Sequence, residues 1–188
     1  MASWARMNWQ AALFILLSAP CFFCVEGNQN PTEVLSHAGT LFLTAFSIDS
    51  VPQWDFICVN STFSSESLNV IRRLVYSEEE IPGNREEWKP MQRTVTFRIQ
   101  GGGDGLHTLN VMDVTPNTDW NYAGDYSVES PGNDCVIICK AGQNGENRCM
   151  VWGKRNTFAA LSNDCQSKFL RKCPDGKKIE EKDVDYCS

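Results

Sequence analysis

The sequence predicts an all-β domain, a barrel or a sandwich of short antiparallel strands, with one helix close to the C-terminus. Short apolar stretches recur between turn residues along residues 41–153, and such regular spacing is typical of these folds. One of the stretches alternates strictly between apolar and polar residues. Cysteines spread over the last third of the chain indicate that disulfides hold the elements together.

The expected strands follow from these stretches. In residues 93–100, Val95, Phe97 and Ile99 share one face and polar residues occupy the other, which predicts a half-buried antiparallel strand. A glycine-rich turn over residues 101–105 leads to the partner strand. The complete set of expected strands is 41–48, 56–59, 69–76, 93–100, 106–114, 125–129, 135–139 and 148–153.

Two regions outside these strands have patterns of their own. A short helix is expected over residues 28–39, because Pro31 follows Asn30 and suits the first helical position. Residues 77–90 contain two glutamate clusters and a Pro-Gly pair, so we expect a solvated loop there.

The C-terminal helix is expected to begin at Asn163 or Asp164, either of which can cap it. Cys165 and Phe169 are four residues apart and therefore share a face. Basic residues fill the last turns, where they favour the helix dipole, and a proline follows them; these are Lys168, Arg171, Lys172 and Pro174.

The N-terminus has the features of a secretory signal peptide. Arg6 supplies a positive charge, residues 11–20 are apolar, and a small residue, Gly27, marks the exit. The apolar run is short for a membrane span, although an N-terminal anchor or a buried strand is the alternative. We therefore expect removal of residues 1–27 and one secreted, extracellular domain over residues 28–188 that is soluble and monomeric.

The charge of the chain excludes some partners. The formal net charge is −6, and basic residues do not cluster, so binding to nucleic acid or insertion into a membrane is not expected. An acidic surface suits a cationic small molecule, but it also simply keeps a protein in solution.

The cysteines that remain after cleavage are odd in number. In a secreted chain they are expected to form disulfides, whereas a zinc site would require CxxC pairs and more histidines. One thiol is then left free, is paired to another chain, or is mispredicted as part of the mature chain. The seven are Cys58, Cys135, Cys139, Cys149, Cys165, Cys173 and Cys187, and the one N-glycosylation sequon starts at Asn60.

An enzyme is not expected. His37 lies in the N-terminal lead-in and His107 next to the glycine turn, and neither neighbours a plausible serine or cysteine nucleophile. The glycine-rich stretch 101–105 lacks the lysine and following helix of a phosphate loop. We expect no catalytic residue, no cofactor and no metal.

Four segments, in order, resemble motifs of the tick salivary lipocalins, especially the histamine-binding group. Residues 49–59 (DSVPQWDFICV) resemble the first hairpin of that family and the strand after it. Residues 133–137 resemble its Asn-Cys-acidic-Val-Ile strand, and residues 149–152 (CMVW) occupy its Glu-Leu-Trp motif. Residues 165–169 match the start of its C-terminal helix.

The resemblance implies an eight-stranded antiparallel lipocalin barrel with the C-terminal helix packed outside. It also implies three disulfides, each worth roughly 2–4 kcal/mol to the folded state. The implied pairs are Cys58 with Cys187, Cys135 with Cys165, and Cys149 with Cys173, which leaves Cys139 over.

Departures from the family pattern bear on the ligand. In histamine binders, carboxylates inside the barrel hold the amine, because a buried cation needs such a partner. Met150 stands where the family has glutamate, and Val136 replaces the acid after the strand cysteine. We therefore favour a hydrophobic ligand, such as a sterol, fatty acid or eicosanoid, over a biogenic amine (histamine or serotonin).

Alternation along the strands suggests which residues line the ligand site. The same inward apolar residues can instead simply fill the barrel, and Asp49 is equally suited to a turn or a helix cap. The candidate ligand-binding residues are Phe46, Asp49, Trp54, Val95, Phe97, Val111, Tyr126, Met150 and Trp152.

A second function class is an immunomodulator that binds a host immune protein or cell surface. The resemblance covers tick lipocalins of this kind, and their loops would then be the functional part. The expected loops are residues 78–88 and 115–122, with Trp88, Trp120 and Tyr122 as aromatic anchors. The alternative is that these aromatic residues pack over the barrel mouth.

Overall fold

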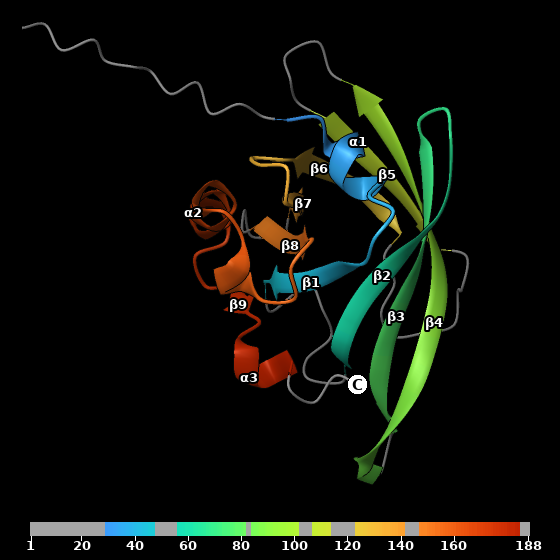
Figure 1. Ribbon diagram of the computed structural model, residues 1–188, viewed down its shortest axis with the longest axis vertical. Coiled ribbons are helices and arrows are strands. Elements are labelled where there is room, and N and C mark those ends of the chain that lie inside the picture. Colours follow the sequence, from blue (N-terminus) through green and yellow to red (C-terminus); the bar gives the residue numbers. More distant parts are fainter. Residues whose placement is uncertain are drawn as a thin grey trace, which may run out of the picture.

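The strands form one antiparallel sheet that closes into a barrel (Figure 1). The structure, a computed structural model, describes residues 29–47, 56–81, 84–101, 107–113, 123–141 and 147–184. Eight strands build the barrel, and β1 closes it by pairing with both β2 and β8. The strands are β1 Leu41–Phe46, β2 Phe56–Ser67, β3 Val70–Ile81, β4 Asn84–Gly101, β5 His107–Asp113, β6 Gly124–Glu129, β7 Cys135–Ala141, β8 Asn147–Gly153 and the short β9 Lys177–Lys178, which pairs with β1.

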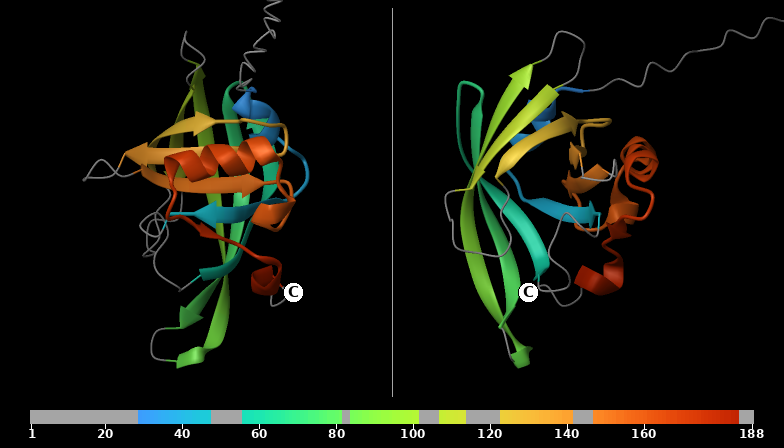
Figure 2. Two further views of the ribbon diagram at one scale, coloured as in Figure 1. Left: turned by 90° about the vertical axis from the view of Figure 1, so that its left-hand side faces the viewer. Right: turned by 180° about the vertical axis from the view of Figure 1, so that it is seen from behind.

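The helices are short and lie at the ends of the described chain. They are α1 Pro31–Leu35, α2 Asn163–Lys172, α3 Glu181–Val184 and a 3-10 turn over Phe158–Ala160. Helix α2 lies across the outer face of β7 and β8 (Figure 2). Within the described part of the chain, we find no helix long and apolar enough to cross a membrane. The predicted eight-stranded barrel with an outer C-terminal helix is confirmed.

Helix α1 begins as the sequence predicts. Asn30 is the N-cap, its side chain accepts a hydrogen bond from the Thr32 amide at 3.0 Å, and Pro31 is the first helical residue. Val34 and Leu35 are buried and belong to the same core cluster as the inward residues of the barrel. Helix α1 therefore closes one end of the barrel with apolar side chains.

A buried arginine fixes the segment that follows α1. Arg73 on β3 is 1% exposed and donates five hydrogen bonds of 2.8–2.9 Å. The acceptors are the carbonyls of Leu35, His37, Gly39 and Ser61, and the Ser61 hydroxyl. Burial lowers the pKa of Arg73 to about 10, so the guanidinium stays protonated at neutral pH and its charge is solvated by oxygen dipoles.

Residues 77–90 are not the solvated loop that we expected. Strand β3 continues to Ile81 and β4 starts at Asn84, so most of this region is a hairpin in register with the barrel. In this register Glu79 lies opposite Lys89. Strand β2 likewise extends from Phe56 to Ser67, well beyond the expected residue 59.

The cap of α2 also differs from the prediction by one residue. Ser162 is the N-cap and accepts from the Cys165 amide at 3.4 Å. Asp134 holds this cap in place, because its carboxylate accepts from the Ser162 amide at 2.6 Å and from the Ser162 hydroxyl at 2.8 Å. The start of α2 is thereby tied to the start of β7, a contact between distant parts of the sequence.

Glu129 anchors the other end of α2. Its carboxylate binds Lys168 at 2.8 Å and also Lys172, both on the helix. Burial disfavours the charged carboxylate, but hydrogen bonds and charge from the two lysines outweigh it and lower the pKa of Glu129. The contact therefore stabilises the fold above the unfolded-state pKa and is lost as pH falls through the folded-state pKa.

Replacement of Arg73 tests the closure of the barrel end. We expect Arg73→Met to lower the free energy of unfolding by about 3 kcal/mol or more, because several buried carbonyls lose their donor. Arg72→Met is the matched control, since Arg72 is the exposed neighbour on the same strand. Urea denaturation measures both variants, and equal effects would contradict the role assigned to Arg73.

Glu129→Gln tests the anchor of α2. At pH 7 we expect a loss of about 1–2 kcal/mol in the free energy of unfolding, since charge-assisted hydrogen bonds are removed. The difference from the wild type should shrink below about pH 4, where the wild-type carboxylate is also protonated. Urea denaturation at pH 7 and pH 3 measures this. Glu180→Gln, in the exposed pair with Lys182, should leave stability unchanged.

Candidate functional site

The inner face of the barrel is one continuous apolar cluster. Cross-strand partners share a face, so the pairs Phe97–Val111, Leu109–Tyr126 and Met150–Ile138 extend it around the wall. The buried members are Val34, Leu35, Leu41, Leu43, Ile71, Val75, Val95, Phe97, Ile99, Leu109, Val111, Val128, Val136, Ile138, Met150 and Trp152; Phe46, Val59, Phe63 and Tyr126 pack against them, partly buried.

All of the described candidate ligand-binding residues belong to this inner cluster. Alternation along each strand is the reason, because every second residue of a barrel strand points inward. These residues are Phe46, Val95, Phe97, Val111, Tyr126, Met150 and Trp152. Asp49 and Trp54 lie outside the described residues, and their contribution to a ligand site stays a prediction.

The opposite face of β1, β7 and β8 packs against α2. Ile137 and Val151 point outward here, next to the inward Ile138 and Met150, and together with Phe169 of α2 they form a second buried cluster. The rings of Phe158 and Phe169 meet edge to face at 5.5 Å. This part of the wall is therefore buried on both sides, so its inward residues are firmly positioned.

The electrostatics of the inner face differ from those of an amine site. Among the buried residues that the structure describes, the one acid is Glu129, and it points outward to the lysines of α2. The buried charges on the inner register are Arg73, which the carbonyls around α1 engage, and Arg93, which is 2% exposed and paired in register with Val75. The described interior is apolar with positive charge.

Polar groups also flank the apolar cluster. Burial raises the pKa of Tyr126, and the Lys140 ammonium lies 5.8 Å from the centre of its ring. His107, at the start of β5, has a buried Nδ1 atom without a hydrogen-bond partner among the described residues. Sequence reasoning missed Arg93 and His107 as inward residues, and it missed the exposed Lys140 beside Tyr126. The strand alternation that identified Val95 and Val111 could have found Arg93 and His107.

The two histidines lie in different parts of the barrel. His37 follows α1, where its carbonyl accepts from Arg73 at 2.8 Å, whereas His107 lies on β5. Burial, together with the charges of Lys154 and Arg73, lowers the pKa of His37. Both residues thus belong to the framework of the barrel.

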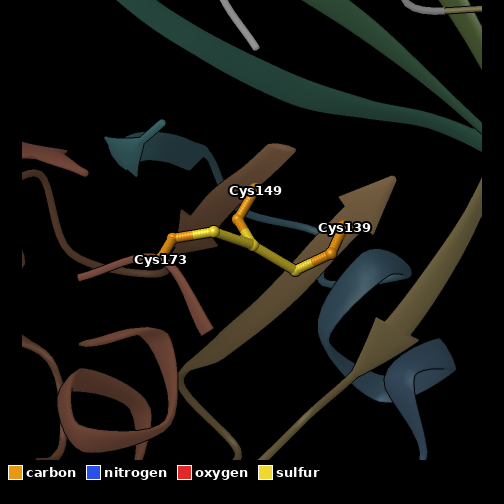
Figure 3. A group of neighbouring side chains, drawn as sticks. All are labelled: Cys139, Cys149 and Cys173. Atoms are coloured by element: carbon orange, nitrogen blue, oxygen red, sulfur yellow. A yellow bond between two sulfur atoms is a disulfide. The ribbon is translucent and has the colours of Figure 1, made fainter. Parts of the chain in front are cut away.

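The described cysteines gather on the outer face of β7 and β8. Cys135 is bonded to Cys165, which joins β7 to α2 and is the pairing that the resemblance implies. Cys149 lies within bonding reach of Cys173, as implied, and also of Cys139 (Figure 3). Cys139 is therefore not an isolated leftover thiol but part of a three-sulfur cluster.

The remaining disulfide and the sequon are only partly described. Cys58 is disulfide-bonded, and Cys187, its predicted partner, lies outside the described residues. Asn60 is on β2, half-buried, and its Nδ2 donates to the Cys58 carbonyl at 3.2 Å. Glycosylation of Asn60 stays a prediction.

The fold and its apolar inner face define a lipocalin, a barrel that binds small molecules inside. The family model described as tick histamine binding protein matches residues 29–185. The chain therefore belongs to the tick histamine-binding protein family.

A solved structure supports the same fold. The chain is similar to japanin from Rhipicephalus appendiculatus bound to cholesterol, with a TM-score of 0.63 and 15% sequence identity. The match covers 79% of this chain and 97% of that one, and at this identity it shows the fold alone. A comparison with curated proteins finds no match.

Proposed function

We propose that this protein is a secreted salivary lipocalin that sequesters a small hydrophobic host mediator inside its barrel. A sterol, a fatty acid or an eicosanoid is the ligand class, and binding is stoichiometric, without turnover. Removal of such a mediator would suppress the inflammatory and immune responses of the host.

The apolar inner cluster is the observation that carries this proposal. A hydrophobic ligand is held by burial of its surface, at roughly 25 cal/mol per Å², and needs few polar contacts. Met150 adds a flexible, polarizable side chain to the wall, which suits ligands of irregular shape. The cholesterol bound to japanin is a hydrophobic ligand held by a barrel of the same fold.

Charge argues against the amine alternative. A protonated amine inside the barrel would need a carboxylate to offset its desolvation, and the one buried acid described, Glu129, faces the opposite side of the wall.

The proposal for a host protein partner has a narrower basis. Of the two predicted loops, residues 115–122 lie outside the described residues, whereas residues 78–88 belong to the β3–β4 hairpin. Trp88 is half-buried on this hairpin and pairs in register with Glu80. We therefore rank protein binding second, as a property compatible with ligand binding.

Two neighbouring isoleucines provide a matched test of ligand binding inside the barrel. Ile137 and Ile138 are each 1% exposed, on one strand, but Ile138 belongs to the inner cluster and Ile137 to the outer one. We expect Ile138→Ala to weaken binding of a fluorescent long-chain fatty acid or sterol by roughly tenfold, because about two methylene contacts are lost.

Ile137→Ala is the control for stability. Both variants should lose a similar amount of unfolding free energy, about 2–4 kcal/mol, but Ile137→Ala should keep the affinity of the wild type. Fluorescence titration of the wild type and both variants, with histamine as a competitor, measures this. Saturable histamine binding without lipid binding would replace the proposal with the amine alternative.

A further inference from the structure

Three sulfur atoms of the outer cluster share one site. Cys139, Cys149 and Cys173 have their sulfurs all within 4.8 Å of one another, and Cys149 lies between the other two (Figure 3). The three side chains are 3%, 0% and 4% exposed. A sulfur atom forms one disulfide at a time, so the bonds from Cys149 to Cys139 and to Cys173 are alternatives.

The backbone allows both bonds. The Cα atoms of Cys149 and Cys173 are 6.4 Å apart, and those of Cys139 and Cys149, a directly opposed pair on β7 and β8, are 4.2 Å apart. Disulfides usually span Cα separations of about 4.4–6.8 Å. The Cys149–Cys173 separation lies within this range and the Cys139–Cys149 separation lies just below it, so either bond forms with a small movement of the chain.

The thiol that remains also has a place in the structure. The Cys173 sulfur lies 3.2 Å from the Asn147 carbonyl, at a distance and angle that suit donation by a thiol. Cys173 can therefore be held as a thiol when Cys139 is bonded to Cys149. Conversely, Cys139 is enclosed by the outer cluster when Cys149 is bonded to Cys173.

We propose that Cys139, Cys149 and Cys173 form a thiol–disulfide exchange site in which Cys149 switches partner. The Cys139 thiolate attacks the Cys149 sulfur, a new S–S bond forms, and the bond from Cys149 to Cys173 breaks. Cys173 leaves as a thiolate and takes up the proton that Cys139 released. One disulfide and one thiol are present before and after, so the step needs no oxidant or reductant.

The exchange changes how the C-terminal region is held. The Cys149–Cys173 bond ties the end of α2 to the barrel wall, just before β9 adds to β1. The Cys139–Cys149 bond joins two strands that are already paired, so it releases the end of α2. The Cys135–Cys165 bond keeps the start of the helix attached in both states. The choice of disulfide therefore determines whether the region from Cys173 to Ile179 is covalently attached to the barrel wall.

Disulfide mapping of the wild-type protein tests the proposal directly. Folded protein is denatured and alkylated at acidic pH, where exchange by thiolates is slow, and is then cleaved without reduction. Trypsin sites at Lys140, Arg148 and Lys172 separate the three cysteines. We expect both isomers, with the minor one in about 1–10% of molecules or more. A single isomer, or a cysteine bonded to another chain, would overturn the proposal.

Two single variants trap the two states. Cys139→Ser should contain only the Cys149–Cys173 bond, and Cys173→Ser only the Cys139–Cys149 bond, with no thiol left in this cluster. Two free thiols in Cys173→Ser would contradict the exchange.

Amide hydrogen exchange distinguishes the two variants. The Ile179 amide, bonded to the Thr44 carbonyl at 2.8 Å, should exchange about tenfold faster in Cys173→Ser than in Cys139→Ser. Equal exchange rates in the two variants would show that the Cys149–Cys173 bond does not stabilise the C-terminal region.

Discussion

The buried guanidinium of Arg73 is the interaction on which the arrangement of this barrel depends. It donates hydrogen bonds to carbonyls at the end of α1, in the segment after α1 and on β2, so it joins two separate regions of the sequence. A buried charge is costly unless it is fully hydrogen-bonded, so the chain folds in a way that supplies all five contacts. The position of Gly39 then sets where β1 starts, and β1 is the strand that closes the barrel.

The second constraint is the two-sided wall of β1, β7 and β8. Strand alternation sends Ile138 and Met150 inward and Ile137 and Val151 outward. The outward residues pack against α2, and two short connections hold that helix: Asp134 to Ser162, and Glu129 to Lys168 and Lys172. Since the wall has a core on each side, disulfide chemistry outside takes place one residue away from side chains of the candidate ligand site.

The sequence predicted most of this arrangement because period-two alternation is a local property. It identified the inward faces of β4 and β8 and the buried face of α2, where Cys165 and Phe169 are both 0% exposed. The errors concern contacts between distant residues. The hairpin over residues 77–90 is polar and lacks an apolar alternation, so it is recognised as a hairpin only from the pairing of β3 with β4. Ser162 is the cap of α2 because Asp134, from another strand, orients it.

Arg73 and Cys139 illustrate the same limit. The sequence places Arg72 and Arg73 side by side, and only the register of β3 decides which of them is buried. The disulfides implied by the resemblance left Cys139 without a partner, because the sequence alone does not show that Cys139 lies opposite Cys149 on the neighbouring strand. The inner face is predictable as a face of the sheet, whereas the polar contacts of the groups buried on it depend on three-dimensional neighbours, as the carbonyls around Arg73 illustrate.

Native mass spectrometry of the protein secreted from eukaryotic cells, with its organic extract analysed in parallel, tests the central claim most directly. The apolar inner cluster predicts a discrete co-purified adduct with the mass of a sterol, a fatty acid or an eicosanoid, which is lost on extraction and restored by adding back the lipid. A bare protein mass that stays bare after incubation with each of these lipids would contradict the account.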